Sequence, residues 1–469
     1  MVDSTALRAA FARRLSAMYG TEVPAYNTLV DVAQDVNREV LERMGADAER
    51  LGSIDRVTAE RHGAIRVGTP TEMAQVARVF GAMGMYPVGY YDLREAASSS
   101  VPVVSTAFRP VDEAELAANP FRVFTSMLVT GDRRFFDEDL ERRLSEFLGA
   151  RRLFPPRLLD LADRAEAEGG LDDAEAEEFL TLATQAFELS RVPVSRSWYT
   201  ELERVSSVAA DIGGVPSTHV NHLTPRVLDI DALYARMSER GVTMIDAIQG
   251  PPRWDGPDLL LRQTSFRALA EPRVFREDDG RIVEDDLRVR FGEVEARGIA
   301  VTPAGRARYD ELSAELDTAL AGRRVTAEER GAVAAKLWEG RVPRTEAELV
   351  TGDLAYFTFH TTGSRPASAP PAGLATLLAE GWVTARPIVY EDFLPRSAAG
   401  IFRSNLTSDG SKDATRAGAE FGAEALAEVL GRRLHDPYAL YASIRAASLT
   451  RVRDELGLDR EIVLPRVRR

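Results

Sequence analysis

Hydrophobic and polar residues follow one pattern twice along this chain. Each copy starts with a histidine four residues before an arginine, at His62–Arg66 and His222–Arg226. A short helical pattern closed by glycine follows, and three strand-like runs come after it. The first copy comprises Pro70–Met83 with Gly84, then Tyr86–Leu93, Val101–Phe108 and Phe121–Leu128. The second comprises Asp231–Arg240 with Gly241, then Val242–Ile248, Asp258–Leu269 and Leu287–Glu295. The pattern predicts an α+β fold built on a duplicated unit.

The start of the first repeated helix carries a strong signal. Thr69-Pro-Thr-Glu72 combines a capping box with proline at the first helical position. Outside the repeats the pattern is mostly helical, with a mixed tail that includes strand-like Leu354–His360 and Trp382–Val389. We therefore expect five segments: an N-terminal helical segment (1–59), the first module (60–130), a helical insertion (131–210), the second module (211–302), and a helical and mixed C-terminal region that closes the active site (303–469).

Composition narrows the class of protein. The chain has 469 residues, 45% hydrophobic and 28% charged, as expected for a globular protein with a large core. Its formal charge of −14 argues against a nucleic-acid partner. No apolar run is long enough to span a bilayer, and the N-terminus lacks the apolar core of a signal peptide, so we expect no membrane association. The absence of cysteine excludes disulfides and thiolate ligands and fits a cytoplasmic protein.

Histidine and carboxylate at equivalent places in the two repeats suggest a metal site. Two histidines and one carboxylate form a facial triad that leaves coordination positions open for substrate and O₂. On a strand, His62 and Arg66 share a face because they are an even number of residues apart. The pair therefore places a metal ligand beside a guanidinium, which suits a chelating substrate that carries a carboxylate.

The pattern leaves several choices open. Glu293 and Glu295 share a face, so periodicity cannot select one as the ligand, and the other is free to pair with Arg290 or Arg297. His219 and His222 are three residues apart and face opposite sides of a regular strand, and the repeat favours His222. Pro225 weakens the strand next to Arg226, which is therefore interpreted as structural. No phosphate loop, dinucleotide fingerprint or serine nucleophile motif is present.

Long runs spread over nearly the whole chain resemble the 2-oxoadipate dioxygenase/decarboxylase family, also called hydroxyglutarate synthase. The runs are Glu60–Gly68, Met83–Leu93, Ser105–Arg109, Pro120–Ser126, His219–Arg226, Leu261–Phe266, Arg290–Glu293, Tyr390–Leu394 and Ser397–Phe402. Resemblance to this family implies the vicinal oxygen chelate architecture, in which paired βαβββ modules curl around a metal.

The resemblance also implies roles for individual residues. The Fe(II) ligands map to His62, His222 and Glu293, and Arg66 maps to the arginine that holds the distal carboxylate of the substrate. The loop around Ser397 maps to a segment that closes over the bound oxo acid. One departure is Arg396, where the family usually has a small apolar residue; if its side chain enters the pocket, it adds a second cation and shifts the preference among dicarboxylates.

The implied reaction converts 2-oxoadipate and O₂ to 2-hydroxyglutarate and CO₂ with Fe(II) as the cofactor, in lysine degradation. The expected partners are thus a small 2-oxo dicarboxylic acid and O₂. Three alternatives remain open at this point. They are another metal enzyme of the same fold (a glyoxalase-like isomerase or an extradiol dioxygenase), a dioxygenase for a different 2-oxo dicarboxylate, and a non-catalytic binding protein.

Overall fold

A five-stranded sheet in the order β2–β3–β4–β1–β6 joins the two repeats. The computed structural model describes residues 1–95, 100–287, 290–363, 369–395, 412–413 and 415–464. The first repeat supplies β1 (Arg61–Val67), α4 (Pro70–Gly81), β2 (Tyr86–Asp92), β3 (Val103–Arg109) and β4 (Arg122–Leu128). The predicted βαβββ order of this repeat is confirmed, with the short helix α5 (Glu113–Ala118) added between β3 and β4.

The start of α4 forms as its sequence predicts. The Thr69 side chain accepts from the Glu72 N–H at 3.1 Å, and the Glu72 carboxylate accepts from the Thr69 N–H at 3.2 Å. Reciprocal capping of this kind satisfies backbone donors that the first turn leaves open. The Glu72 carboxylate also accepts from Arg151 at 2.6 and 2.8 Å, which ties the helix to the region after the first repeat.

The second repeat departs from the prediction at its strands. It contains β6 (Val220–Pro225), α11 (Ile230–Glu239), β7 (Leu261–Ser265) and β10 (Glu293–Arg297). The expected strand Val242–Ile248 is wrong, because this segment makes only isolated bridges such as Met244 with Phe266. The expected strand Asp258–Leu269 is shorter, since Leu260 has a φ of 60° that interrupts the extended backbone before β7.

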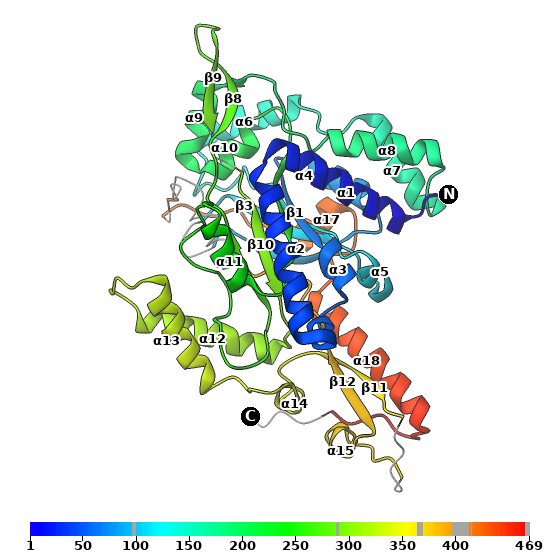
Figure 1. Ribbon diagram of the computed structural model, residues 1–469. Coiled ribbons are helices and arrows are strands. Elements are labelled where there is room, and N and C mark those ends of the chain that lie inside the picture. Colours follow the sequence, from blue (N-terminus) through cyan, green and yellow to red (C-terminus); the bar gives the residue numbers. More distant parts are fainter. Residues whose placement is uncertain (96–99, 288–289, 364–368, 396–411, 414, 465–469) are drawn as a thin grey trace.

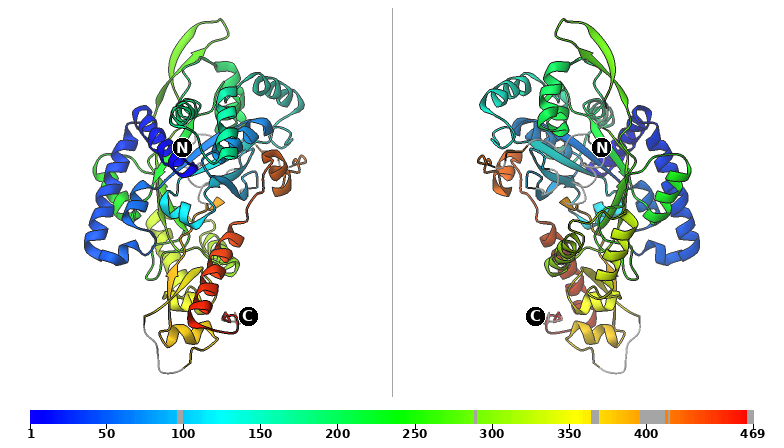
Figure 2. Two further views of the ribbon diagram at one scale, coloured as in Figure 1. Left: turned by 90° about the vertical axis from the view of Figure 1, so that its right-hand side faces the viewer. Right: turned by 90° about the vertical axis from the view of Figure 1, so that its left-hand side faces the viewer.

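A hairpin was missed between β7 and β10. It is formed by β8 (Glu271–Arg276) and β9 (Ile282–Leu287), and its turn contains Gly280 with a φ of 84°. The predicted strand Leu287–Glu295 is therefore wrong in its bounds: β9 ends at Leu287 and β10 starts at Glu293. β8 also pairs with the two-residue strand β5 (Val194–Ser195). The hairpin projects at one end of the molecule (Figures 1 and 2).

Helices lie around the sheet (Figure 1). The N-terminal helices are α1 (Ser4–Glu22), α2 (Ala25–Met44), η1 (Gly45–Glu49) and α3 (Ile54–Ala59). Between the repeats lie α6 (Glu138–Ala150), α7 (Pro156–Glu168), α8 (Asp173–Gln185), α9 (Arg196–Val205) and α10 (Ser207–Gly213). Every helix in the described part of the chain is too short or too polar to cross a lipid bilayer.

The C-terminal region extends to the opposite end from the hairpin (Figure 2). Its helices are α12 (Pro303–Ala319), α13 (Ala327–Glu339), α14 (Glu346–Thr351), α15 (Leu374–Ala379), α17 (Ala423–Leu430) and α18 (Pro437–Leu456). Strands β11 (Phe357–Thr361) and β12 (Val383–Pro387) confirm the two strand-like runs, and the structure shows that they pair antiparallel. The α+β class is confirmed, whereas the division into five segments stays a prediction.

Candidate metal centre

Three buried side chains from three strands meet at the junction of the repeats. His62 lies on β1, His222 on the neighbouring strand β6, and Glu293 at the start of β10. β1 and β6 pair antiparallel with Ala64 opposite His222, so His62 is the diagonal neighbour of His222 on the same face. β10 continues beside β6 through a bridge between Arg226 and Glu295. The sheet therefore delivers all three side chains to one place.

The ligand atoms of this group lie close enough to hold one ion. One nitrogen or oxygen from each of His62, His222 and Glu293 lies within 4.8 Å of the others. The two Nε2 atoms of His62 and His222 are 3.2 Å apart, and Glu293 lies 3.7 Å from His62 Nε2 and 3.2 Å from His222 Nδ1. All three residues are at most 4% exposed. A buried group of two imidazoles and one carboxylate could therefore bind a metal.

The two glutamates of β10 have different partners. Glu295 accepts from His62 Nδ1 at 2.8 Å, from Arg297 at 2.7 and 2.9 Å, and from Arg122 at 3.2 Å. Glu293, in contrast, faces both histidine rings and pairs with no arginine or lysine of the described chain. Geometry therefore favours Glu293 as the possible ligand, because Glu295 contacts Nδ1 of the His62 ring and has Arg297 as its partner.

Electrostatics separates the two carboxylates in the same way. Burial works against ionisation of Glu295, but Arg297, His62 and Arg122 outweigh it and lower the Glu295 pKa to about 2. Burial and the neighbouring Glu295 charge raise the pKa of Glu293 well above its usual range. Burial lowers the pKa of His62, and burial with the adjacent His62 and Arg66 lowers that of His222 still further. The lowered pKa values favour the neutral form of both rings, which is the form that binds a metal.

These residues fit a divalent cation on the observations made above. Among the described residues His222 Nδ1 has no hydrogen-bond partner, and the buried Glu293 carboxylate lies within 4 Å of both histidine rings but of no arginine or lysine nitrogen. A buried carboxylate without a cation is unfavourable, and a bound metal removes that penalty. The oxygen and nitrogen donors suit iron, manganese, zinc, nickel or cobalt, so the donor set alone does not select the metal.

Arg66 and His219 meet on a second buried carboxylate that sequence reasoning missed. Arg66 donates to Asp211 Oδ2 at 2.5 Å, Asn221 donates to the same oxygen at 2.7 Å, and His219 Nε2 lies 3.3 Å from Asp211 Oδ1. His219 therefore pairs with Asp211 and does not belong to the His62–His222–Glu293 group, although the register of β1 and β6 shifts between Ala64 and Ile65, so the alternation of a regular strand does not hold from His219 to His222. No pattern pointed to Asp211, because it lies in α10, before the first strand of the second repeat.

Sequence reasoning also missed a network of buried charges that reaches the site through the contact between Arg122 and Glu295. Arg122 donates to Glu60 at 2.7 Å and to Glu391 by a short hydrogen bond, and Glu391 also pairs with Arg56. Arg226 donates to Glu60 at 2.9 Å, which confirms its structural interpretation. Arginines at inward positions of strands were the available signal, since buried arginine is rare without a carboxylate partner.

The segment Tyr390–Leu394 brings the C-terminal region to the site. The Phe393 ring lies edge-on to His62 with centroids 4.9 Å apart, and Phe291 lies 5.7 Å from His222. Asp392 binds Arg109 at 3.0 and 3.3 Å and accepts a short hydrogen bond from Tyr441. The predicted site residues Arg396 and Ser397 lie outside the described residues, directly after this segment.

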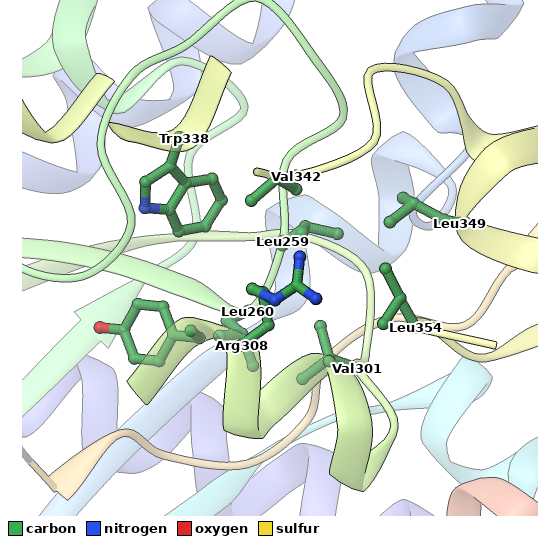
Figure 3. Close-up of a pocket in the computed structure, with 10 residues that line it drawn as sticks. Leu259, Leu260, Val301, Arg308, Trp338, Val342, Leu349 and Leu354 are labelled. Atoms are coloured by element: carbon green, nitrogen blue, oxygen red, sulfur yellow. The ribbon is translucent and has the colours of Figure 1, made fainter. Parts of the chain in front are cut away.

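Two cavities lie elsewhere. One of about 20 Å³ lies against α12 and α13, and its walls are mostly apolar, with Leu260, Val301 and Trp338 among the side chains that line it (Figure 3). It has room for about one water molecule and no carboxylate in its lining, so it is no candidate for a metal or an acid. The other, of about 320 Å³, lies between α9 and the β8–β9 hairpin and is lined by Tyr199 and Phe275 among others.

Comparison with known proteins agrees with this geometry. A family model described as 2-oxoadipate dioxygenase/decarboxylase matches residues 11–405. The 2-oxoadipate dioxygenase/decarboxylase of Mycobacterium tuberculosis is 56% identical over 438 residues, covering 93% of this chain and 96% of the relative. That of Escherichia coli K12 is 40% identical over 460 residues, covering 96% and 98%.

Solved structures give the same result for the fold. The crystal structure of the hydroxyglutarate synthase from Pseudomonas putida in complex with 2-oxoadipate matches with a TM-score of 0.84 and 39% identity, covering 98% of this chain and 99% of that one. These matches extend over nearly the whole chain and include the strands that carry His62, His222 and Glu293. The chain therefore belongs to the 2-oxoadipate dioxygenase/decarboxylase family.

Proposed function

We propose that this protein is an Fe(II)-dependent oxygenase that converts 2-oxoadipate and O₂ to 2-hydroxyglutarate and CO₂. The observation that carries the proposal is the buried His62–His222–Glu293 group, in a chain that is 39% identical to a structure with 2-oxoadipate bound. Carbon, hydrogen and oxygen balance between the two sides of this reaction. The oxo acid is oxidised by O₂ directly, so no nicotinamide or flavin is required.

His62, His222 and Glu293 would hold the iron. Bound there, Fe(II) supplies the chemistry that the side chains lack, namely chelation of the 2-oxo acid and activation of O₂. Glu295 fixes the His62 ring by accepting from its Nδ1, so that Nε2 carries the lone pair that faces the site. Phe393 and Phe291 pack against the two rings and limit their rotation and the access of water.

Arg66 would orient the substrate. It lies four residues from His62 on the same strand, and its charge acts on both His222 and Glu293. A guanidinium at this place suits the distal carboxylate of a dicarboxylic acid. Asp211 holds Arg66 in position through the 2.5 Å hydrogen bond. Fixing both ends of the substrate lowers the entropic part of the barrier by several kcal/mol.

Further expectations rest on the resemblance alone. Arg396 and Ser397 are proposed to contact the bound acid, the C-terminal region to close over it, and the reaction to serve lysine degradation. The cysteine-free composition is the observation behind a cytoplasmic location, which stays a prediction.

Anaerobic reconstitution with Fe(II) tests the proposal. After addition of 2-oxoadipate and O₂, oxygen uptake is followed with an electrode and 2-hydroxyglutarate by mass spectrometry. We expect one O₂ consumed for each 2-hydroxyglutarate formed. Metal binding without oxygen uptake would favour an isomerase of the same fold, and uptake with another 2-oxo acid only would indicate a different dicarboxylate, as the Arg396 departure allows. Uptake with a catechol would indicate an extradiol enzyme.

A further inference from the structure

Tyr19 joins the two backbone segments that carry His222 and Glu293. It lies in the last turn of α1 and is fully buried. Its hydroxyl donates to the backbone carbonyls of Asn221 at 3.2 Å and Phe291 at 3.1 Å. Asn221 directly precedes His222, and Phe291 lies two residues before Glu293. One hydroxyl from the N-terminal helical segment therefore contacts both segments that position these members of the metal-ligand group.

The Tyr19 contacts complement the pairing of the two strands. β6 and β10 run parallel, and a bridge between Arg226 and Glu295 joins them after the two ligand positions. The Tyr19 hydroxyl joins the same two segments before the ligand positions. The backbone is therefore tied together on both sides of His222 and Glu293. The distance between these two residues depends on the Tyr19 hydroxyl as well as on strand pairing.

Further contacts of α1 hold the same segment before β10. The Arg290 guanidinium lies over the Tyr19 ring, 5.5 Å from its centroid, and donates to Glu22 at 2.5 Å. Glu22 is three residues after Tyr19, so the two side chains lie on one face of the helix. The Phe291 ring in turn packs against His222 with centroids 5.7 Å apart. α1 thus contacts the segment that leads into β10 in three ways.

The Tyr19 hydroxyl is suited to bridging because it stays protonated. Burial raises the pKa of Tyr19 well above its usual range, so the group remains a donor at neutral pH. A hydroxyl has one hydrogen, so the two carbonyls share it in a three-centre bond, and both distances exceed the usual value of about 2.8 Å. Asn221 and Phe291 are at most 1% exposed. Loss of the hydroxyl would therefore take a donor from two buried carbonyl groups.

We propose that Tyr19 is a positioning residue that sets the distance between His222 and Glu293, and thereby the affinity and the geometry of the metal site. The role rests on the proposed function and gives the N-terminal helical segment a part in it. Tyr19 acts through the backbone. Without its hydroxyl, the segment that leads into Glu293 can shift relative to β6, and a site of this kind tolerates a displacement of only about 0.5 Å.

Metal binding by the full-length Tyr19→Phe protein tests this role. The substitution removes only the hydroxyl and keeps the ring contacts with Tyr26 and Arg290, so the protein should fold. Fe(II) affinity is measured anaerobically by competition with a chromophoric chelator, and we expect it to fall about 10-fold or more with one ion bound per chain. Co(II) serves as a spectroscopic probe, and its visible bands should change in position or intensity because they report the coordination geometry.

Tyr356→Phe is the matched control. Tyr356 is also buried, and its hydroxyl also donates to a backbone carbonyl, that of Tyr438 in α18, at 3.4 Å. Neither residue belongs to the segments that carry the metal-ligand group. Tyr356→Phe should therefore bind Fe(II) with the wild-type affinity and give the wild-type Co(II) spectrum.

Unfolding in urea with and without Co(II) separates a positioning role from a purely structural one. A positioning role reduces the stabilisation by the metal, by about 1.4 kcal/mol for each tenfold loss of affinity. If Tyr19→Phe lowers the free energy of unfolding equally with and without Co(II), or binds metal as Tyr356→Phe does, the role of Tyr19 is refuted while the proposed function stands. If the wild-type protein binds no Fe(II), the proposed metal site fails, and the role of Tyr19 with it.

Discussion

His62 Nδ1 and the Glu295 carboxylate are 2.8 Å apart, and the contact is buried on both sides. The hydrogen bond fixes which nitrogen of His62 carries the proton and leaves Nε2 for the site. Glu295 is held in turn by Arg297 and Arg122. The orientation of His62, a proposed metal ligand, therefore depends on two arginines that act through Glu295.

Glu295→Gln should weaken metal binding without abolishing it. The amide retains the shape of the side chain but loses the charge that supports His62, so we expect affinity to fall about 10–100-fold with the stoichiometry unchanged. A competition titration against a chromophoric chelator measures this. Glu284→Gln, on the exposed face of β9, is the control and should bind as wild type. Complete loss of the metal in Glu295→Gln would mean that Glu295 is itself a ligand.

Removal of a proposed ligand should have a larger effect. His62→Ala, His222→Ala and Glu293→Gln each leave two of three donors, and we expect none of these proteins to retain stoichiometric iron after gel filtration or to consume O₂ with 2-oxoadipate. His219→Ala is the matched histidine control, because His219 contacts Asp211 and Asn221 rather than the group. Retention of iron by Glu293→Gln would contradict the assignment of Glu293.

Arg66→Met should separate metal binding from substrate binding. The variant is expected to keep its iron and to lose 2-oxoadipate affinity by at least about 30-fold, because truncating one partner of a buried charge pair costs about 2 kcal/mol or more. Asp211 would lose its main cation in this protein, so Arg66→Met with Asp211→Asn is measured alongside. Unchanged 2-oxoadipate turnover in both proteins would count against a role for Arg66.

The buried pair between Arg109 on β3 and Asp392 in the C-terminal region should stabilise the fold. Asp392→Asn leaves the Arg109 guanidinium buried and unpaired, so we expect the free energy of unfolding to fall by about 3–5 kcal/mol. Urea denaturation of the metal-free protein measures the loss. Glu178→Gln removes the partner of Arg157 in an exposed pair and should change stability by less than about 1 kcal/mol. Equal losses of unfolding free energy in Asp392→Asn and Glu178→Gln would refute a stabilising role for the Arg109–Asp392 pair.

Gly292 allows close packing directly before Glu293. A Cβ added there would lie 2.2 Å from Cε1 of Phe266, which is fully buried and cannot move aside. Gly292→Ala should therefore destabilise the protein by about 1–3 kcal/mol and displace Glu293, with weaker metal binding as a second readout. A Cβ added at Gly331 in α13 would have no neighbouring atom within 4 Å. Gly331→Ala should therefore be neutral or stabilise the protein by up to about 1 kcal/mol.

Local patterns predicted the first repeat well because each signal there acts over a few residues. The capping box of Thr69 and the glycine after α4 fix the helix, and alternation fixes the strands. The second repeat was harder, since Leu260 adopts a positive φ that no propensity suggests for leucine, and the hairpin around Gly280 inserts two strands between expected neighbours.

The candidate site shows the same division between local and long-range information. His62, His222 and Arg66 could be selected from strand periodicity and the repeat. Glu293 could be distinguished from Glu295 only by the contacts that each makes. Of the three partners of Glu295, Arg297 is two residues further along the chain, but Arg122 and His62 lie on other strands. Asp211 was missed because its significance depends on Arg66 and His219, which only three-dimensional packing brings to it.

The antiparallel seam between β1 and β6 has a consequence for assembly of the molecule. Each of the two strands contributes one histidine, so neither repeat alone contains the proposed ligand set, and an ion bound there would link the two repeats. Its binding free energy adds to the docking of the repeats by mass action, about 2.7 kcal/mol when free metal is a hundred times its dissociation constant. The concentration of free metal would then determine the stability of the folded protein as well as its catalytic activity.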